Sequence, residues 1–242
     1  MKEKGHQVLI DVQDDGRVVC QSVAGTLVTS WWQRWQQEFC GHQTSAKSPL
    51  AKAVGLKKNH PLTVWDLTCG LGHDSLHLLG LAAHVVAFER SPIMQALIKA
   101  NWAQIKKAYG ATLTTPPSGA SAPWEERGGH FSFYPGDFIS LGPKFLAQQP
   151  APEVFYLDPM FGDEGILRKS LPKKAMQILP QLVGLDEDAS TLWQTAFTLA
   201  QTYGVGRLVV KRALHAPALG RWDFQIKGKA IRFDVTMITA KH

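Results

Sequence analysis

The stretch that decides the fold is Val64-Trp65-Asp66-Leu67-Thr68-Cys69-Gly70-Leu71-Gly72-His73-Asp74. It reads as a short buried strand that runs into a glycine-rich loop and then into a helix. Gly70 and Gly72 let the backbone turn tightly and approach a ligand without a Cβ clash. Because ligands of open α/β sheets bind beyond the carboxyl ends of the strands, this loop predicts a nucleoside cofactor.

An acid follows the next predicted strand, where Phe88-Glu89-Arg90 lies about 17 residues past Gly72. A carboxylate at the end of that strand can accept hydrogen bonds from both hydroxyls of a ribose. The pair of loop and acid therefore favours a nucleoside cofactor over a generic strand–helix turn, which remains the alternative.

The chemistry of the loop distinguishes between two cofactors. A dinucleotide site uses G-x-G-x-x-G, but Ser75 stands where the third glycine belongs. Asp66 and Asp74 would repel a diphosphate, whereas they suit a cationic sulfonium that carries an ammonium group. The loop thus favours S-adenosylmethionine (SAM) over NAD.

The segment Val154-Phe155-Tyr156-Leu157-Asp158-Pro159-Met160-Phe161 reads as a second buried strand that runs into a loop. Asp158 and a backbone carbonyl of the Pro159 turn could accept hydrogen bonds from an exocyclic amine, while Phe161 stacks on its ring. Catalysis would then be mostly positioning of an unstacked or flipped base beside the methyl donor. The alternative is that Asp158-Pro159 only ends the strand.

A third predicted strand is followed by Gly136-Asp137, in Tyr134-Pro135-Gly136-Asp137. Asp137 could contact the adenine amine of the cofactor, and an aspartate that only serves the turn is the alternative.

The pattern from Leu62 onward alternates strand and helix, which predicts a doubly wound, mostly parallel sheet. Two last strands joined by Gly228-Lys229 predict a C-terminal antiparallel hairpin. We expect strands at 62–67, 84–89, 130–134, 152–157, 206–211, 222–227 and 231–238, and helices at 73–80, 91–109, 171–184 and 188–203. Residues 114–129, rich in Pro, Gly, Ser and Ala, are expected to form a surface loop or insertion.

The N-terminal region differs from the rest of the chain. Residues 7–23 predict a hairpin around Asp14-Asp15-Gly16, so we expect a small subdomain over 1–45 and a methyltransferase domain over 46–242. Three tryptophans and a run of lysines could hold RNA, with core packing of the tryptophans as the alternative. These residues are Trp31, Trp32, Trp35, Lys47, Lys52, Lys57 and Lys58.

Other cations lie near the expected site. Lys211-Arg212 end a predicted strand at the ligand edge, and Lys169, Lys173 and Lys174 follow the tetrad. Phosphate contacts by these side chains are one interpretation, and plain solvation is the other.

Composition fits this interpretation. The chain has 242 residues, a formal net charge of +6 and a pI near 9.2, which permit an anionic partner such as RNA. It contains no apolar run long enough to span a bilayer and no apolar signal stretch. Three scattered cysteines, Cys20, Cys40 and Cys69, form neither a disulfide framework nor a zinc site. We therefore expect a cytoplasmic protein with no membrane partner and no metal.

The ordered set of motifs resembles the RsmJ family of bacterial 16S rRNA guanine-N2 methyltransferases. The matching segments span about 50–238 and include residues 66–74, Glu89-Arg90, 157–161, Val209-Val210-Lys211-Arg212 and Arg232-Phe233-Asp234. The resemblance implies a Rossmann-like fold and a guanine substrate in the terminal hairpin loop near the 3′ end of 16S rRNA. It also implies cofactor contacts at His73-Asp74, Glu89-Arg90, Gly136-Asp137 and Asp158.

We therefore predict methyl transfer from SAM to the exocyclic N2 of a guanine in 16S rRNA or the small ribosomal subunit. N6-adenine and protein-glutamine methyltransferases use related tetrads and remain alternatives. A non-catalytic RNA-binding protein that keeps the fold is a further alternative, and the oligomeric state is left open.

Overall fold

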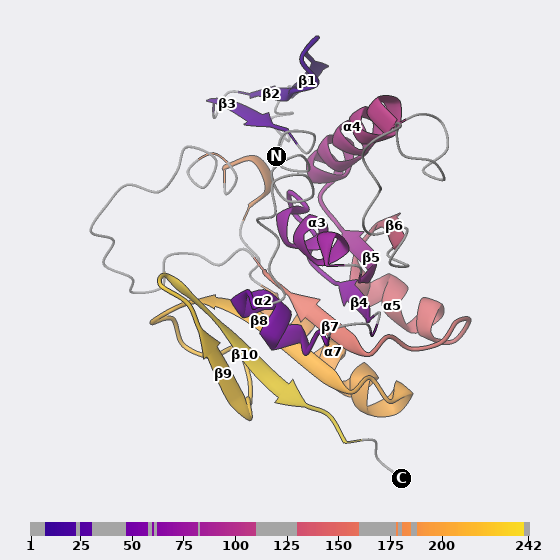
Figure 1. Ribbon diagram of the computed structural model, residues 1–242, viewed down its shortest axis with the longest axis vertical. Helices are drawn as coiled ribbons and strands as arrows, with labels where there is room; N and C mark the ends of the chain where they lie inside the picture. The colour runs from indigo at the N-terminus through magenta and orange to yellow at the C-terminus, as the bar shows by residue number, and fades with distance from the viewer. Residues whose placement is uncertain are drawn as a thin grey trace, which may run out of the picture.

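A seven-stranded sheet forms the centre of the fold (Figure 1). The computed structural model describes residues 8–22, 25–30, 47–57, 60, 62–81, 83–109, 130–159, 178, 181–184 and 188–239. The strand order is β6-β5-β4-β7-β8-β10-β9. The strands are β4 (Thr63–Asp66), β5 (His84–Glu89), β6 (His130–Pro135), β7 (Val154–Leu157), β8 (Arg207–Ala213), β9 (Phe224–Lys227) and β10 (Ile231–Met237).

The pairing confirms the predicted fold class. β6, β5, β4, β7 and β8 pair in parallel, whereas β10 runs antiparallel to both β8 and β9. β10 thus inserts between its two neighbours, and the C-terminal hairpin closes one edge of a Rossmann-like sheet. The carboxyl ends of the parallel strands meet at one edge, where ligands of such sheets bind.

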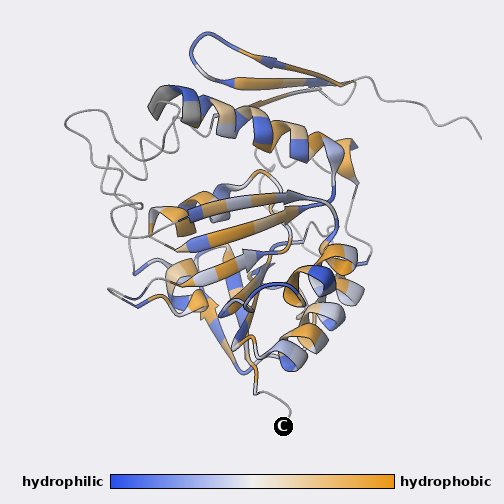
Figure 2. Cartoon of the chain, turned by 90° about the vertical axis from the view of Figure 1, so that its right-hand side faces the viewer, coloured by the Kyte–Doolittle hydropathy of each residue, from blue (hydrophilic) through white to orange (hydrophobic). Residues whose placement is uncertain are grey.

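Helices cover both faces of this sheet, and hydrophobic residues run along the strands and the inner sides of the helices (Figure 2). The described helices are α2 (Pro49–Val54), α3 (His73–Gly80), α4 (Pro92–Tyr109), α5 (Phe138–Leu146) and α7 (Ala189–Tyr203). Successive residues of β4 point to opposite faces, so Val64 lies in the core with α2 and α3, while Trp65 packs with Phe138.

Two of these helices were not predicted. Ser48 caps α2 by accepting a hydrogen bond from Ala51 N at 3.2 Å. α5 was obscured by Gly142 and Pro143, which are poor helix formers. Gly142 lies under the ring of Phe138, where a Cβ would collide with the ring. Packing therefore overrides the local propensity in α5.

A separate three-stranded antiparallel sheet precedes the central one. It consists of β1 (Leu9–Val12), β2 (Val18–Ser22) and β3 (Gly25–Thr29). The predicted hairpin of β1 and β2 is confirmed, and β3 is a strand that was not predicted. This sheet packs on α4, and Asn101 of α4 donates a hydrogen bond to Thr29 Oγ1 at 2.7 Å. The division into domains at residue 45 stays a prediction.

Several expectations fall outside the described residues. They concern Trp31, Trp32, Trp35, Lys58, residues 114–129, Lys169, Lys173, Lys174 and most of the predicted helix 171–184. Of that helix, Ile178 and residues 181–183 are described and helical. Among the described helices, none is both long and apolar enough to cross a bilayer. Within the same residues no cluster of His, Cys, Asp and Glu could hold a metal ion.

Candidate functional site

A cavity of about 360 Å³ opens at the carboxyl ends of β4, β5, β6 and β7. This volume lies in the range of ordinary small-molecule sites, about 300–1,000 Å³. Most of the predicted cofactor loops meet here, although they come from four separate strands. The predicted residues that line the cavity are Gly70, Glu89, Arg90, Gly136, Asp137 and Asp158.

Glu89 ends β5, lines this cavity and is 7% exposed. Its Oε2 accepts a hydrogen bond from Gly70 N, and its Oε1 accepts one from Ser91 N, both at 2.7 Å. Gly70 has a φ of +56° and Gly72 a φ of +69°, so both adopt the left-handed conformation that favours glycine. Glu89 also lines the cavity, and the contact with ribose hydroxyls expected of it stays a prediction.

Asp66 lies beneath the glycine loop and is not among the residues that line the cavity. It is 1% exposed, and its Oδ2 accepts a hydrogen bond from Ser75 Oγ at 2.5 Å. Burial raises the pKa of Asp66 to about 7, with further increases from the nearby Asp74 and Asp158. The expected direct contact of Asp66 with a sulfonium or ammonium group is therefore not supported by its position. It braces the loop instead.

Lys211 joins the cofactor loop to the tetrad. Its Nζ donates to Asp74 Oδ2 at 2.7 Å and to Asp158 Oδ2 at 2.8 Å. The phenol of Tyr156 donates to the same Asp74 oxygen at 2.6 Å. Asp74 is thus turned toward Lys211 and, like Gly72 and His73, is not among the cavity-lining residues.

The pKa shifts of Asp74 and Lys211 agree with an ion pair between them. Burial alone would raise the pKa of Asp74, but the charge and hydrogen bond of Lys211 and the hydrogen bond of Tyr156 lower it overall. Burial would lower the pKa of Lys211, whereas Asp158 and Asp74 raise it overall. Burial and the adjacent Asp74 raise the pKa of Tyr156. The ammonium and the Asp74 carboxylate are therefore charged at neutral pH.

Gly136 and Asp137 form the turn after β6. Asp137 caps α5, because its Oδ1 accepts a hydrogen bond from Ile139 N at 3.2 Å. Gly136 has a φ of +146°, and a Cβ there would collide with Leu141. Asp137 therefore stabilises the turn as an N-cap, and it also lines the cavity.

The tetrad is described only in part. Asp158 lines the cavity, and its backbone N–H donates to Thr68 Oγ1 at 2.7 Å, which ties the second loop to the first. Pro159 is buried, while Met160 and Phe161 lie outside the described residues.

The two predicted cations at the end of β8 lie in different surroundings. Lys211 forms ion pairs with Asp74 and Asp158. Arg212 is 5% exposed, and its Nε donates to Pro217 O at 2.9 Å. The suggestion that Arg212 contacts phosphate is therefore wrong, because its guanidinium is buried beneath the loop that follows β8.

Sequence reasoning missed the bridging role of Lys211 and the contacts of Tyr156 and Thr68. For Tyr156 the sequence did carry a signal, because Tyr156 stands two residues before Asp158 at the end of β7, and alternate residues of a strand point to the same face. No sequence pattern linked Lys211 to Asp74, which is 137 residues away in the chain.

The hydrogen-bond acceptors and apolar side chains that line the cavity fit SAM. Glu89, Asp137 and Asp158 supply carboxylates for hydroxyl, amine and cationic groups, and Ile93, Phe138 and Ile139 supply apolar walls. Arg90 also lines it, and its Nη1 forms a 2.6 Å ion pair with Asp188, which offsets its charge.

Comparison with known proteins agrees with this geometry. A family model described as "Putative SAM-dependent methyltransferase" matches residues 14–112 and 141–238. The chain belongs to this family of SAM-dependent methyltransferases. The family's cofactor is thus the one that the loop chemistry favoured over NAD.

Curated relatives give a narrower comparison. "Ribosomal RNA small subunit methyltransferase J" of Magnetococcus marinus is 37% identical over 77% of this chain and 66% of that protein. The protein of the same name from Yersinia enterocolitica is 34% identical over 92% of this chain and 77% of that protein. The chain spans about two thirds of the length of the first of these relatives.

A solved structure supports the fold. A SAM-dependent methyltransferase from Neisseria gonorrhoeae aligns with a TM-score of 0.61 over 100% of this chain and 87% of that one, at 24% identity.

Proposed function

We propose that this chain transfers a methyl group from SAM to the exocyclic N2 of a guanine in 16S rRNA of the small ribosomal subunit. The observation that carries the proposal is the position of Asp158. This residue lines the cavity, Lys211 holds its carboxylate, and Thr68 accepts a hydrogen bond from its backbone N–H. A carboxylate fixed beside a methyl donor suits an amine that must be oriented for attack.

The described residues divide the work between cofactor and substrate. When bound, SAM supplies an electrophilic methyl group. Glu89 would accept hydrogen bonds from the ribose hydroxyls, and Asp137 would accept one from the adenine amine. Asp158 and a backbone carbonyl of the Pro159 turn would accept hydrogen bonds from the guanine amine, which favours a more tetrahedral nitrogen. Phe161 would stack on the base and fix its attack angle.

The choice of RNA as substrate rests on similarity and charge. The curated relatives described above carry a name that specifies ribosomal RNA of the small subunit. A formal net charge of +6 suits a polyanionic partner. We place the reaction in the cytoplasm, where ribosomal RNA is found in bacteria, and assign 46–242 to the methyltransferase domain and 1–45 to a small N-terminal subdomain.

The test is transfer of a tritiated methyl group to small subunits isolated from a strain that lacks this enzyme. Wild-type protein should label one guanine, identified as N2-methylguanosine by mass spectrometry. Asp158→Ala should abolish labelling because the amine loses its acceptor. Asp15→Ala, in the exposed β1–β2 turn, is the matched control and should label normally.

Two outcomes would contradict the proposal. Near-normal labelling by Asp158→Ala would remove Asp158 from the active site. Label on adenine N6 or on protein glutamine would assign a different acceptor to the same cavity.

A further inference from the structure

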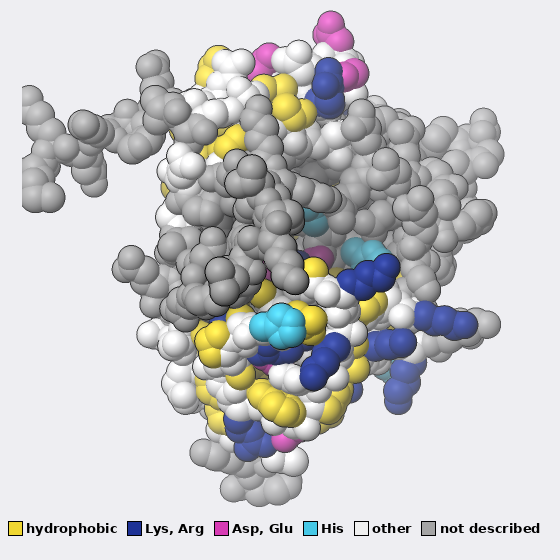
Figure 3. Space-filling model, turned by 90° about the vertical axis from the view of Figure 1, so that its left-hand side faces the viewer, with side chains coloured by type: hydrophobic (Ala, Val, Ile, Leu, Met, Phe, Trp, Pro, Cys, Tyr) yellow, Lys and Arg dark blue, Asp and Glu magenta, His cyan; other side chains and the backbone are white. Residues whose placement is uncertain are grey.

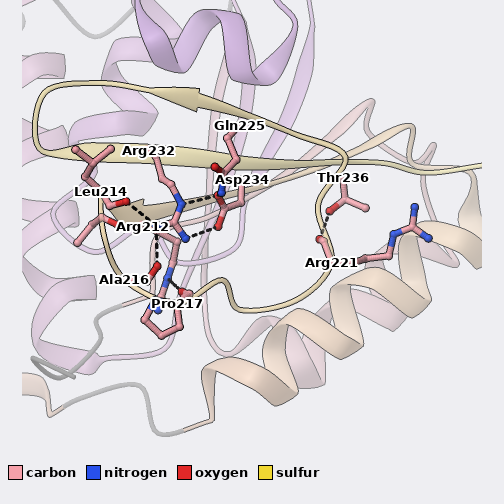
Figure 4. Close-up of polar contacts among 10 residues, drawn as sticks. Arg212, Leu214, Ala216, Pro217, Arg221, Gln225, Arg232, Asp234 and Thr236 are labelled. Atoms are coloured by element: carbon pink, nitrogen blue, oxygen red, sulfur yellow. Dashed lines mark hydrogen bonds and ion pairs between the residues drawn. The ribbon is translucent and has the colours of Figure 1, made fainter. Parts of the chain in front are cut away.

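One side of β10 is covered by an irregular loop instead of a helix. Phe233 and Val235 pack in the core with α2. The alternate residues Arg232, Asp234 and Thr236 lie on the opposite side, where the loop between β8 and β9 passes over them (Figure 4). Thr236 Oγ1 donates to Arg221 O of this loop at 2.7 Å.

Arg232 fastens the first part of that loop. Its Nη1 donates to the carbonyl oxygens of Ala213, Leu214 and Ala216, at 3.1, 2.8 and 2.7 Å. Its Nε and Nη2 donate to the two carboxylate oxygens of Asp234, at 2.8 and 3.0 Å. Arg232 is 5% exposed and Asp234 is 4% exposed.

This arrangement fixes the backbone of the turn. Buried backbone carbonyl groups outside the sheet need hydrogen-bond donors. Here the guanidinium of Arg232 donates to three of them. A buried ion pair is costly unless its remaining polar atoms are also satisfied, which they are in this case. With Arg212 bound to Pro217 O as well, the carbonyl oxygens of four of the five residues 213–217 accept hydrogen bonds from buried guanidinium groups, which restrains the turn.

The fixed turn lies at the edge of the sheet that carries the candidate site. Lys211, which reaches Asp158, stands two residues before the turn begins. Leu214 N donates to Ala230 O at 3.0 Å, and Gly228 N closes the β9–β10 hairpin on Ile231 O at 2.8 Å. The turn 213–217 and the hairpin tip 227–231 therefore lie side by side, and we call them together the turn rim. β9 is two strands from β8, or about 10 Å.

The turn rim is basic. Lys227 and Lys229 are exposed, and His215 is exposed on the adjacent turn. Neither 213–217 nor 227–231 contains an acid. Neither lysine forms an ion pair with any residue that the structure describes. Lys and Arg side chains gather on the lower half of the face that Figure 3 shows, with few acids among them.

We propose that the turn rim is a preformed seat for the phosphate backbone of the substrate RNA, next to the target base. This proposal rests on the proposed function, since it assumes that the substrate is RNA. Lys227 and Lys229 contact phosphates, which sets register without reading sequence. His215 offers a ring on which an unstacked neighbouring base can lie. The rigidity that Arg232 supplies reduces the ordering cost of binding.

The test compares Lys227→Ser/Lys229→Ser with the matched control Lys144→Ser. Lys144 is an exposed lysine of α5, the helix that follows β6 at the opposite edge of the sheet. Two assays are run on each protein. One is methylation of undermethylated small subunits at saturating SAM, and the other is anisotropy of a fluorescent RNA hairpin between about 50 and 200 mM salt, a range over which phosphate contacts are sensitive.

The double variant should raise the KM for subunits about five-fold or more and leave kcat and the Kd of SAM unchanged. Its plot of log affinity against log salt should be shallower by about 1.4, since each lost contact to single-stranded RNA removes about 0.7. Lys144→Ser should match wild type in both assays.

If the wild-type enzyme is active and the double variant keeps its KM and its salt slope, the turn rim does not bind the RNA backbone. The proposed function would still stand. If wild type methylates no subunit, the proposed function fails. The anisotropy then still decides whether the turn rim binds RNA, and equal slopes in the two proteins would reject it.

Discussion

Replacing Lys211 by Met tests the bridge between the cofactor loop and the tetrad, because Met keeps an apolar stem and removes the ammonium. The Lys211 side chain is 21% exposed, and those of Asp74 and Asp158 are 24% and 40% exposed. The two carboxylate oxygens lie 2.7 and 2.8 Å from the same nitrogen, so they are at most about 5.5 Å apart. The variant removes the attraction of the ammonium for both carboxylates and leaves their existing mutual repulsion without compensation.

The magnitude follows from the attraction that is lost. Removing one partner of a buried ion pair costs about 3–5 kcal/mol. The partial exposure of these three side chains screens part of that attraction, so we expect the free energy of unfolding to fall by about 2 kcal/mol. Methylation should also fall, because the loop of Asp158 loses the ion pair that holds it to Lys211.

The pH dependence of the loss provides a second check. Lys211 lowers the pKa of Asp74, and a carboxyl group with a lowered pKa stabilises the fold above its unfolded pKa, which is about 3.9. This contribution is lost as the pH falls through the folded pKa. The difference between Lys211→Met and wild type should therefore be largest at neutral pH and should shrink below about pH 4.

Urea unfolding at pH 7 and near pH 3 measures both effects, with Lys144→Met as the control that removes an exposed lysine. The control should stay within about 0.5 kcal/mol of wild type. If Lys211→Met also stays within that margin at pH 7, or if its loss is the same at pH 3, the bridge does not stabilise the site as argued.

Three further predictions concern single side chains. Glu89→Ala should weaken SAM binding by about 1–3 kcal/mol in calorimetry, because ribose hydroxyls lose a charged acceptor; unchanged affinity would reject the assignment. Asp66→Asn should remove a pH dependence of the free energy of unfolding. The carboxyl group of Asp66 has a pKa of about 7 in the folded protein, whereas it loses its proton near pH 3.9 in the unfolded chain. Wild-type stability should therefore decline as pH rises from about 4 to 7, by about 4 kcal/mol at most, and a parallel decline in the variant would contradict this origin. Arg232→Met should cost about 3–5 kcal/mol in denaturant unfolding because Asp234 stays buried without its partner. Arg232→Met/Asp234→Leu should recover part of that loss, and no recovery would show that the ion pair is not the cause.

Local signals in the sequence predicted much of this protein. The glycine loop at 70–72, the acid at the end of β5 and the Asp14-Asp15-Gly16 turn each depend on a few neighbouring residues, so their conformations follow from backbone sterics. Apolar runs at 84–89 and 154–157 likewise predicted buried parallel strands. Together they determined the fold class, the choice of SAM over NAD and the edge of the sheet at which the site lies.

Contacts between distant segments decided the rest. α5 was missed because Gly142 is favourable only once Phe138 packs over it. Asp66 was expected to meet the ligand, but folding buries it against Ser75. Lys211 was expected to be one of two similar cations, yet it bridges Asp74 and Asp158 while Arg212 is buried. The physical reason is that a charged side chain takes its role from the charges and burial around it, and these exist only after the chain has folded.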